Sequence, residues 1–423
     1  MINVTFLTGE YPPMQGGIAD HTAYLAHHLT AVGAASSILT SRRWLEADTE
    51  SPALFAHSGA RQPLIFPLLP GWGRHAWPAI RRYLETYQPD ILHLQYQAAA
   101  FDLAGWINWL PWYLKRRKGR TRVVTTFHDL RVPYIFPKAG PFRWQSMLAL
   151  ARHSDAVICT NREDLHTLEK QLSVSSLQLP GDNLHAKRPI SNLPSPLLTL
   201  IPLGSNVEPQ PPADFDRQAW RGKYQADPET LLLAYFGFMN ESKGGEELIE
   251  ALALLRQRGL DARLLLIGGD VGHADPTNVA YAQKVQALIE QHQLGAFVHR
   301  TGYVDLAAVS ANLLAADAVV MPYRDGVSFR RTTLIAALRH GCPVVSTFPA
   351  DPALIPEIRS GENMLLVPPR QAEALAQTLS SLATDTALRQ RLASGAKTLG
   401  DLFEWESIAG QTVALYRAIN PWD

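Results

Sequence analysis

The feature of this sequence that most constrains its fold is the repeated alternation of short apolar runs with longer segments of helical periodicity. Runs such as 231–238 (LLLAYFGF) and 317–323 (DAVVMPY) are largely apolar without alternation, as expected for strands that are covered on both faces. Between such runs, a segment such as 244–259 carries Leu248, Ala251, Leu252 and Leu255 at helical spacing and ends at Gly259. Repeated β-α-β units predict an α/β fold with parallel, doubly wound sheets.

The length of the chain predicts two domains. A single hydrophobic core rarely extends beyond about 250–300 residues, and this chain has 423. The polar, proline-rich stretch 204–220 has the composition of a domain boundary. We therefore expect Rossmann-like domains over residues 1–204 and 205–400, and a C-terminal helix in 401–423 that packs back on the first domain. Two such domains would face a central cleft and bind ligands beyond the carboxyl ends of their strands.

The composition argues against a nucleic-acid partner and for a reducing compartment. Lysine plus arginine and aspartate plus glutamate both number 39, so no net charge attracts a polyanion. Cys159 and Cys342 lie in apolar runs without metal-site spacing, which predicts buried free thiols. The stretch 1–10 does not have the pattern of a signal peptide, and no apolar stretch is long enough to span a bilayer. We expect a cytoplasmic protein.

A loop of the second half carries groups that suit an anion. It follows the run 317–323 and holds two arginines, two threonines, a serine and an aspartate where a helix is expected to begin. Backbone N–H groups at a helix start bind phosphate, and guanidinium and hydroxyl groups add charge-assisted hydrogen bonds. The predicted ligand is a diphosphate, bound by Asp325, Ser328, Arg330, Arg331, Thr332 and Thr333. In the alternative interpretation, Ser328 caps the helix and the arginines are solvated.

A second loop, 236–247 (FGFMNESKGGEE), begins where a predicted strand ends at Gly237, and it supplies Gly237, Asn240 and Lys243. A lysine at the start of a helix is a compact partner for phosphate, and glycine lets the backbone approach a ligand. The alternative is a lysine that is simply solvated. If both loops follow strands of one sheet, Lys243 and the helix start at 328–333 form two sides of one pyrophosphate site.

Two loops of the first half are further candidates. Pro12 and Pro13 precede Gly16 and Gly17, which open a helix without side chains in the way; the alternative is a plain turn. His128 ends another apolar run and is able to hydrogen-bond a sugar hydroxyl, although a lone histidine is more often structural. The first strand of neither half is followed by a G-x-G-x-x-G motif, which argues against a nicotinamide or flavin cofactor.

Together and in this order, these loops resemble the retaining glycosyltransferases of the GT-B fold, in the large fourth sequence family. The stretch 11–29 (YPPMQGGIADHTAYLAHHL) is similar to the family's N-terminal glycine loop and helix, and 125–130 (TTFHDL) to its histidine strand. The stretch 236–244 (FGFMNESKG) is similar to its donor loop, and 341–347 (GCPVVST) follows its signature helix. The resemblance extends over nearly the whole chain and implies two Rossmann-like domains that bind a nucleoside diphosphate sugar.

The resemblance also implies roles for individual residues. It makes Lys243, His128 and Arg330 the catalytic candidates, and it places Tyr303 and Val304 in the base pocket. The residues that it implies for donor binding are Gly16, Gly17, Gly237, Asn240, Lys243, Tyr303, Val304, Asp325, Ser328, Arg330, Arg331, Thr332 and Thr333.

Three positions depart from the family pattern. The family's two glutamates, with seven residues between them, correspond to Ser328 and Ala336 here, and Phe238 replaces the donor-loop arginine. We expect Arg330 and Arg331 to compensate for the missing cation.

The implied reaction is transfer of a sugar to an acceptor hydroxyl with retention of the anomeric configuration. The departing diphosphate would be stabilised by Lys243, the two arginines and the N–H groups of the helix start. The sequence has no carboxylate cluster with metal-site spacing, so the interpretation includes no metal ion and no cofactor. The leaving phosphate is expected to take the acceptor proton, and Asp20 and Gln95 are candidates for the acceptor side.

Other classes of protein remain open. A non-catalytic nucleotide-sugar-binding subunit is consistent with the two missing glutamates. An epimerase of the same fold would need carboxylates in the cleft, and a phosphorylase would need a lysine that binds pyridoxal phosphate.

The segment 101–122 bears on the acceptor. It places Trp106, Trp109 and Trp112 before a run of lysines and arginines, a combination that suits an interfacial segment on anionic lipid. That interpretation favours a lipid-linked acceptor and peripheral contact with the inner face of a membrane. The alternative, which we prefer, is a helix that packs its tryptophans on the sheet and ends in a solvated basic turn. The expected partners are a nucleotide sugar and a glycan or lipid-linked acceptor.

Overall fold

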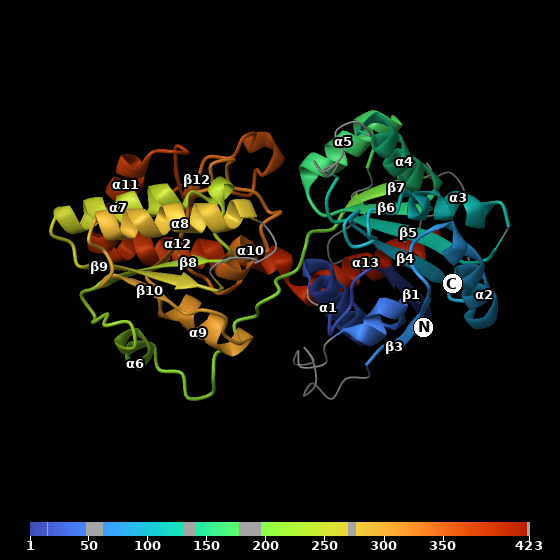
Figure 1. Ribbon diagram of the computed structural model, residues 1–423, viewed down its shortest axis with the longest axis horizontal. Helices are drawn as coiled ribbons and strands as arrows, with labels where there is room; N and C mark the ends of the chain where they lie inside the picture. Colours follow the sequence, from blue (N-terminus) through green and yellow to red (C-terminus); the bar gives the residue numbers. More distant parts are fainter. Residues whose placement is uncertain are drawn as a thin grey trace. The chain divides into compact units, whose positions relative to one another are not determined.

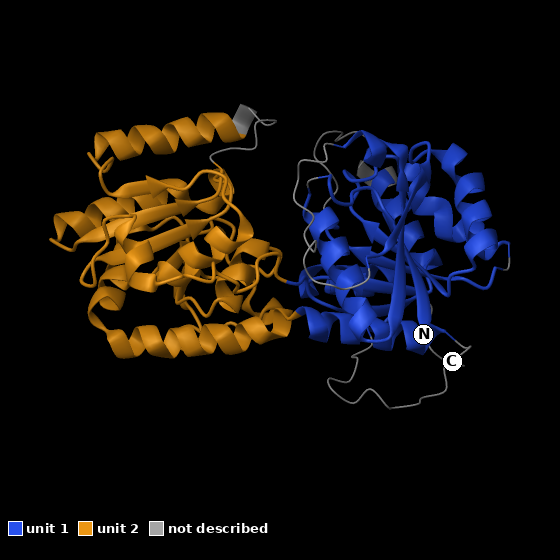
Figure 2. Ribbon diagram, turned by 90° about the horizontal axis from the view of Figure 1, so that it is seen from below, with its two compact units in different colours: residues 1–204, 405–423 blue, residues 205–404 orange. Residues whose placement is uncertain are grey.

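The chain folds into two compact units, each built on a parallel sheet. The computed structural model describes residues 1–14, 16–47, 62–117, 119–130, 140–176, 196–269 and 276–420. Unit 1 comprises residues 1–204 with 405–423, and unit 2 comprises residues 205–404 (Figure 2). Every apolar run that was predicted to be a strand is one, and the predicted α/β class is confirmed (Figure 1).

The sheet of unit 1 has seven parallel strands in the order β3-β2-β1-β4-β5-β6-β7. The strands are β1 (Ile2–Thr8), β2 (Ala34–Ser41), β3 (Leu64–Leu69), β4 (Ile91–Tyr96), β5 (Arg122–Phe127), β6 (Ala156–Cys159) and β7 (Leu197–Leu200). The strand order reverses between β1 and β4. Because ligands of doubly wound sheets bind at such a switch point, the loops after β1, β4 and β5 are the places to look for a site in this unit.

Helices cover both faces of this sheet. They are α1 (Gly17–Ala31), α2 (Trp77–Tyr87), α3 (Leu110–Lys115), α4 (Gly140–His153), α5 (Arg162–Leu172) and α13 (Trp405–Ile419). On one face, Tyr24 of α1 stacks on Trp405 of α13 with ring centroids 5.2 Å apart, and Val413 joins the same buried cluster. On the other face, Ile80 of α2 and Leu150 of α4 are completely buried. The last helix of the chain is therefore part of the core of unit 1.

The sheet of unit 2 has six parallel strands in the order β10-β9-β8-β11-β12-β13. The strands are β8 (Leu231–Phe236), β9 (Ala262–Ile267), β10 (Val298–Arg300), β11 (Ala318–Met321), β12 (Val344–Thr347) and β13 (Leu365–Val367). β8 and β11 are neighbours at the switch point. The two loops that were predicted to bind an anion follow these two strands, so they start from adjacent strand ends.

The helices of unit 2 are α6 (Arg217–Gly222), α7 (Gly245–Gln257), α8 (Pro276–Gln291), α9 (Leu306–Ala315), α10 (Thr332–Arg339), α11 (Ala372–Thr384) and α12 (Thr386–Gly400). Figure 1 shows α7 and α8 on one side of the sheet and α9 on the other. Leu233 of β8 and Val320 of β11 are completely buried, as continuous apolar runs predict.

The helix α10 begins later than the sequence analysis expected. It starts at Thr332 and not at Ser328, because residues 328–331 form a separate turn in which the Arg331 N–H donates to the Ser328 carbonyl at 3.2 Å. Phe329 anchors this turn by packing on Phe403, with ring centroids 4.9 Å apart. The alternative in which Ser328 caps α10 is therefore wrong.

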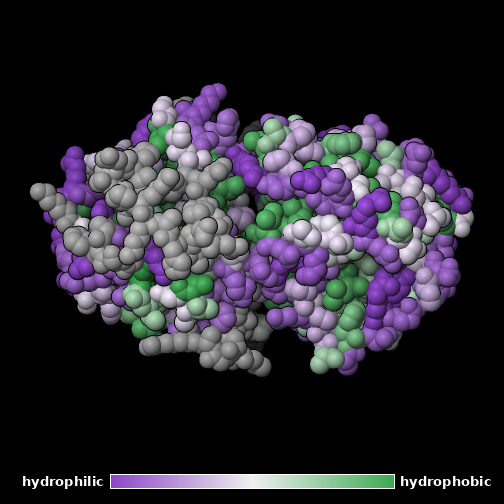
Figure 3. Space-filling model, turned by 180° about the vertical axis from the view of Figure 1, so that it is seen from behind, coloured by the Kyte–Doolittle hydropathy of each residue, from purple (hydrophilic) through white to green (hydrophobic). Residues whose placement is uncertain are grey.

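Cys159 and Cys342 are buried free thiols, as predicted. Within the described residues, no helix is long and apolar enough to cross a membrane. In Figure 3, the described hydrophobic residues on the visible face form small patches among hydrophilic ones.

Candidate functional site

In unit 2, the loops after β8 and β11 meet at Gly237. This glycine has a φ of +116°, and a Cβ atom placed on it would lie 3.0 Å from Cγ2 of Thr333 and 3.6 Å from Nζ of Lys243. Lys243 belongs to the loop after β8, and Thr333 to the first turn of α10. The predicted lysine and the predicted helix start therefore adjoin one space over the Gly237 backbone, which we call the cation site.

The cation site has two cations and one carboxylate. Burial lowers the pKa of the Lys243 ammonium to about 8, with repulsion from Arg331 adding to the shift and attraction from Asp325 opposing it. Nη2 of Arg331 donates to both carboxylate oxygens of Asp325, at 2.8 and 2.6 Å. Asp325 thus balances one cation, and the cation site keeps a net positive charge while Lys243 is protonated.

The first turn of α10 offers backbone donors at the cation site. Arg331 is the N-cap residue and makes no side-chain cap hydrogen bond. Among the hydrogen bonds of the described residues, none uses the N–H groups of Thr332 or Thr333, whereas those of Leu334 and Ile335 donate to the Arg331 carbonyl. Free N–H groups at a helix start, beside a buried ammonium, are a combination that binds phosphate oxygens.

An ion-pair network that the sequence analysis missed joins the two loops. The Arg324 side chain is only 10% exposed and donates to Glu247 at 2.9 Å, to Glu246 at 2.7 Å and to Glu241 at 3.2 Å. Its backbone N–H donates to the Ser242 carbonyl at 2.8 Å. Because all these partners follow β8 while Arg324 follows β11, this one side chain fixes the two loops relative to each other.

The other predicted residues of unit 2 shape the loops. Oδ1 of Asn240 accepts a hydrogen bond from the Ser242 hydroxyl at 2.9 Å. The Ser328 hydroxyl accepts from the backbone N–H of Arg330 at 3.3 Å, which stabilises the turn before α10. The three atoms nearest a Cβ atom on Gly237 belong to Thr333 and Lys243, and none of them belongs to Arg330. Phe238, which replaces the family's arginine, is 57% exposed.

A pocket opens beside the cation site at the carboxyl ends of β8 and β9. Its lining consists of Tyr235, Gly237, Met239, Leu266, Ile267, Gly268, Gly269, Ala282, Val285 and Arg300. Tyr303 and Val304, which the resemblance placed in a base pocket, are not part of this lining, and Tyr303 is 86% exposed. Arg300 was not predicted; a residue inside a strand run gives no sequence signal of a site.

In unit 1, the glycine loop lies against a carboxylate. A Cβ atom on Gly16 would lie 2.1 Å from Oε2 of Glu10, whereas for a Cβ atom on Gly17 the described part of the chain offers no such neighbour within 4 Å. Burial raises the pKa of Glu10, with Arg43 opposing the shift, and burial raises the pKa of Asp20 to about 6. The loop therefore has two carboxyl groups that hold protons more readily than usual. The described residues contain no group of three or more His, Cys, Asp or Glu side chains that could hold a metal ion.

His128 directly follows β5 and is held by Gln95 of β4. Nε2 of His128 lies 2.7 Å from Oε1 of Gln95. Because an amide oxygen only accepts, His128 carries its proton on Nε2, and Nδ1 is left as an acceptor. Burial lowers the pKa of His128 to about 4, so the ring is neutral at physiological pH. Gln95, a candidate for the acceptor side, is completely buried and orients the histidine.

His21 of α1 is a further residue of this region that the sequence analysis missed. Its ring meets the ring of His128 edge-on, with centroids 4.8 Å apart. Burial lowers the pKa of His21 well below its usual value, and the neighbouring imidazoles of His128 and His93 add to the shift. Its Nδ1 atom is buried without a hydrogen-bond partner in the described part of the chain. The sequence gives no indication of which face of α1 meets His128.

The tryptophans of the segment 101–122 differ in their surroundings. Trp109 packs against the core of unit 1, as expected of a helix on a sheet, whereas Trp106 is 50% exposed. The guanidinium carbon of Arg116 lies 4.2 Å from the ring centre of Trp112. The segment 101–122 therefore has one tryptophan packed on the core, as in the interpretation that we preferred, and another, Trp106, that is half exposed.

Two residues of the basic run in the segment 101–122 form ion pairs within unit 1. Lys115 lies 3.7 Å and Arg122 lies 3.6 Å from the carboxylate of Asp155. Lys118 lies outside the described residues. Two of the cations thus stabilise the fold.

Two family models match the chain. Residues 15–177 match the model of glycosyltransferase family 4, and residues 230–385 match the model of glycosyl transferases group 1. The first match includes the glycine loop and His128, and the second includes Lys243 and the start of α10.

Relatives with known names match the chain at moderate identity. The D-inositol 3-phosphate glycosyltransferase of Jonesia denitrificans is 24% identical over 424 residues, which cover 95% of this chain and 91% of the relative. The phosphatidyl-myo-inositol mannosyltransferase of Mycobacterium tuberculosis is 29% identical over 224 residues, which cover 52% of this chain and 53% of the relative.

Solved structures share the fold over the full length. A glycosyltransferase from Rickettsia africae has a TM-score of 0.70 at 18% identity and covers 100% of this chain and 99% of its own. The sucrose-phosphate synthase from Thermosynechococcus elongatus has a TM-score of 0.67 at 22% identity, with 99% and 98% covered. Anabaena HepE in complex with UDP and glucose has a TM-score of 0.69 at 17% identity, with 98% of both chains covered. These likenesses confirm the predicted GT-B fold.

Proposed function

Since the chain belongs to the family 4 glycosyltransferases, we propose that it transfers a sugar from a nucleoside diphosphate sugar to an acceptor hydroxyl, with retention of the anomeric configuration and without a metal ion. The observation that carries this proposal is the convergence of Lys243 and the first turn of α10 on Gly237. An ammonium and free N–H groups around one open space suit the two phosphates of a nucleoside diphosphate.

The chemistry follows from the charge that develops on the leaving group. The bond between the anomeric carbon and the diphosphate oxygen breaks, and the bond to the acceptor oxygen forms on the same face of the sugar. The acceptor proton passes to an oxygen of the departing diphosphate. Lys243 and the N–H groups of α10 would stabilise the negative charge of that diphosphate, which is the largest electrostatic demand of the reaction. We propose no metal ion, because these groups are able to meet that demand.

We assign to His128 of unit 1 a hydrogen bond with the donor sugar, as the family resemblance implies. Its neutral ring and its Nδ1 acceptor suit a sugar hydroxyl. A hydroxyl that donates to Nδ1 would orient the sugar, and no proton would leave it. His128 would then act as a positioning residue with a fixed tautomer.

For the acceptor, we propose a glycan or a lipid-linked molecule. The relatives' names include a phosphatidyl-myo-inositol mannosyltransferase, and Trp106 offers an exposed aromatic ring on the segment 101–122. Peripheral contact with a membrane through this segment, and a location in the cytoplasm, remain part of the proposal.

The proposal is tested by incubating the purified protein with UDP-, GDP-, ADP- and TDP-sugars. Thermal shift measures binding, release of the nucleoside diphosphate measures turnover, and proton NMR of the product gives the anomeric configuration. Turnover in the presence of EDTA is expected. Stabilisation without turnover would instead favour a non-catalytic binding subunit, which the replacement of the two family glutamates by Ser328 and Ala336 makes a specific alternative.

A further inference from the structure

The ring of His21 lies between two other aromatic rings of unit 1. It meets the ring of His128 with centroids 4.8 Å apart and an angle of 82° between the planes, and the ring of Trp405 lies 5.2 Å away at a tilt of 56°. His21 is only 8% exposed. A ring that packs between two others in a dense interior has little freedom to turn.

Trp405, the first residue of α13, is itself fixed from two sides. It stacks on Tyr24 of α1 with an angle of 9° between the ring planes. A Cβ atom on Gly204 would lie 2.3 Å from Cε2 of Trp405, so the backbone of Gly204 closes off another side of the indole. His21 is therefore supported by a side chain that has no room to give way, and this support reaches His128 through the ring of His21.

Ring contacts, and not hydrogen bonds, hold His21 in place. Its Nδ1 atom is buried and finds no hydrogen-bond partner in the part of the chain that the structure describes. What His21 offers to His128 is thus a flat, confined ring. Phenylalanine keeps such a ring and is the conservative replacement at this position.

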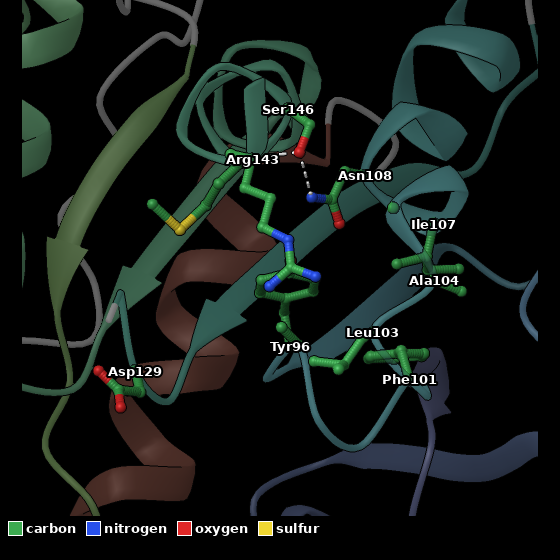
Figure 4. A pocket seen from close by; sticks show the side chains of 12 residues that line it. Tyr96, Phe101, Leu103, Ala104, Ile107, Asn108, Asp129, Arg143 and Ser146 are labelled. Carbon is green, nitrogen blue, oxygen red and sulfur yellow. Dashed lines mark hydrogen bonds between the residues drawn. The ribbon is translucent and has the colours of Figure 1, made fainter. Parts of the chain in front are cut away.

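The backbone at His128 is anchored, which leaves the side-chain torsions as the freedom that has to be fixed. Its N–H donates to the Tyr96 carbonyl at 3.0 Å. Figure 4 shows Tyr96 and Asp129, the residue after His128, in the wall of one pocket of unit 1. The chain on both sides of the imidazole is therefore part of a packed structure.

The hydrogen bond to Gln95 restrains the His128 ring only in part. The 2.7 Å contact to Oε1 of Gln95 is made by Nε2. The second side-chain torsion of histidine is intrinsically broad, and the ring turns about the Cβ–Cγ axis. Nε2 lies nearer to this axis than Nδ1 does, so a turn of the ring moves Nδ1 more. A contact with the ring itself is needed to fix the direction of Nδ1, and His21 supplies one.

We propose that His21 is a positioning residue for the transfer reaction: supported by Trp405, it sets the plane of the His128 ring and thereby the direction in which Nδ1 accepts a hydrogen bond from the donor sugar. This inference rests on the proposed function, which assigns that hydrogen bond to His128. A misplacement of about 1 Å in an active site costs on the order of 100-fold in rate, so a ring that is free to turn should slow the transfer. His21 itself touches no substrate in this role.

The first test observes His128 without any substrate, by NMR of protein with 15N-labelled histidine. The wild type should show one tautomer of His128, with the proton on Nε2, and His128→Ala identifies its signals by their absence. His21→Ala should show a mixture of tautomers or lines broadened by ring motion. His21→Phe should restore the single tautomer. Unchanged His128 signals in folded His21→Ala would overturn the inference.

The second test is a double-mutant cycle on turnover, with the nucleotide sugar that the wild type uses. His21→Ala should lower kcat about tenfold or more, whereas His21→Phe should retain most of the turnover. In the His128→Ala background, His21→Ala should change kcat less than about twofold, because the residue that it positions is gone. An equal loss in both backgrounds, or a loss in His21→Phe as large as in His21→Ala, would overturn the inference.

Leu29→Ala is the matched control for lost packing. It truncates a completely buried side chain of α1 two turns beyond His21, so it should lower the melting temperature without changing the tautomer of His128. If His21→Ala fails to fold, His21→Leu fills the space without a planar ring and takes its place, with the same expectations. A wild type that turns over no donor would contradict the proposed function, whereas the NMR test decides separately whether His21 orients His128.

Discussion

Nε of Arg324 donates to Oε1 of Glu247 at 2.9 Å, and this contact joins the end of β11 to the helix that follows β8. The relationship matters because the loop after β8 carries Lys243 and the loop after β11 leads into the first turn of α10, the two halves of the cation site. Lys243 and the first turn of α10 remain next to each other at Gly237 only if the two loops keep their relative position.

Replacing Arg324 by methionine should therefore disturb both stability and donor binding. The change removes the cation that Glu241, Glu246 and Glu247 share, while Glu246 keeps its contact with Lys284 at 2.6 Å. We expect the free energy of unfolding to fall by about 3 kcal/mol. The KM for the donor should rise while the KM for the acceptor changes little, a difference that general destabilisation does not produce. Thermal unfolding measures the loss of stability. Steady-state kinetics with varied donor and varied acceptor, recorded below the melting temperature, measure the two KM values.

Arg258→Met is the matched control for Arg324→Met. Arg258 pairs with the exposed Glu373, and loss of such a surface pair should cost less than about 1 kcal/mol. If Arg324→Met and Arg258→Met have the same stability and the same donor KM, the Arg324 network does not position the loops.

The pKa of Lys243 predicts how diphosphate binding depends on pH. The ammonium is protonated below a pKa of about 8, so affinity for UDP should weaken above pH 8, by about tenfold at pH 9. In the ligand-free protein, the contribution of Lys243 to the free energy of unfolding changes with pH in the opposite direction. Because an unfolded lysine keeps its proton up to about pH 10.5, the cost of burying the charge disappears between pH 8 and 10.5, and this group's contribution to stability rises there.

Lys243→Arg separates this titration from other effects of pH. A guanidinium stays protonated throughout the range, so the affinity of this variant for UDP should be nearly constant between pH 7.5 and 9.5. Calorimetric titrations at several pH values measure both proteins. Identical pH profiles would assign the titration to a different group.

The glycine loop of unit 1 allows a test that separates ligand contact from folding. A methyl group at Gly17 meets no side chain or more distant backbone atom of the described residues within 4 Å, so Gly17→Ala should leave the melting temperature within a few degrees of the wild type. If the donor lies against this glycine, turnover should nevertheless fall at least about tenfold. Gly410→Ala, where a methyl group also meets nothing within 4 Å, should change neither quantity. Full activity of Gly17→Ala would remove Gly17 from the donor site.

Gln95→Glu should change the protonation of His128. A carboxylate in place of the amide favours the imidazolium, so the pKa of His128 should rise from about 4 towards neutrality. Turnover would then decline as the pH falls below 7, because protonated Nδ1 no longer accepts a hydrogen bond. NMR titration of the ring and the pH profile of kcat check this. Gln95→Asn, which keeps a neutral amide, should not show the acidic decline, and its appearance there would contradict this role of Gln95.

The fold was predictable because its signal is local. Residues 231–235 form a strand that is buried throughout, because helices cover both faces of the sheet. The start of α10 was not predictable to the residue. The aromatic contact between Phe329 and Phe403 joins positions far apart in the chain and favours a separate turn at 328–331.

The cation site was predictable in part, because the order of strands in a doubly wound sheet brings two loops together. Lys243 and Thr333 could be paired because both follow strands that a doubly wound sheet makes neighbours. The network of Arg324 could not, since each of its glutamates alone looks like a solvated charge at a helix start. His21 was missed because helical periodicity gives the buried face of α1 but not the residue that the face meets.

The measurement that most directly tests the central claim is the affinity of nucleoside diphosphates for the wild type and for Lys243→Met, determined by calorimetry at pH 7 with UDP, GDP, ADP and TDP. Lys397→Met, which removes an exposed lysine of α12, serves as the control. A diphosphate held by the Lys243 ammonium and the N–H groups of α10 should bind the wild type and Lys397→Met equally. Its affinity for Lys243→Met should be about 30-fold weaker or more. Equal affinity of all three proteins, or no binding of any diphosphate to the wild type, would contradict the account.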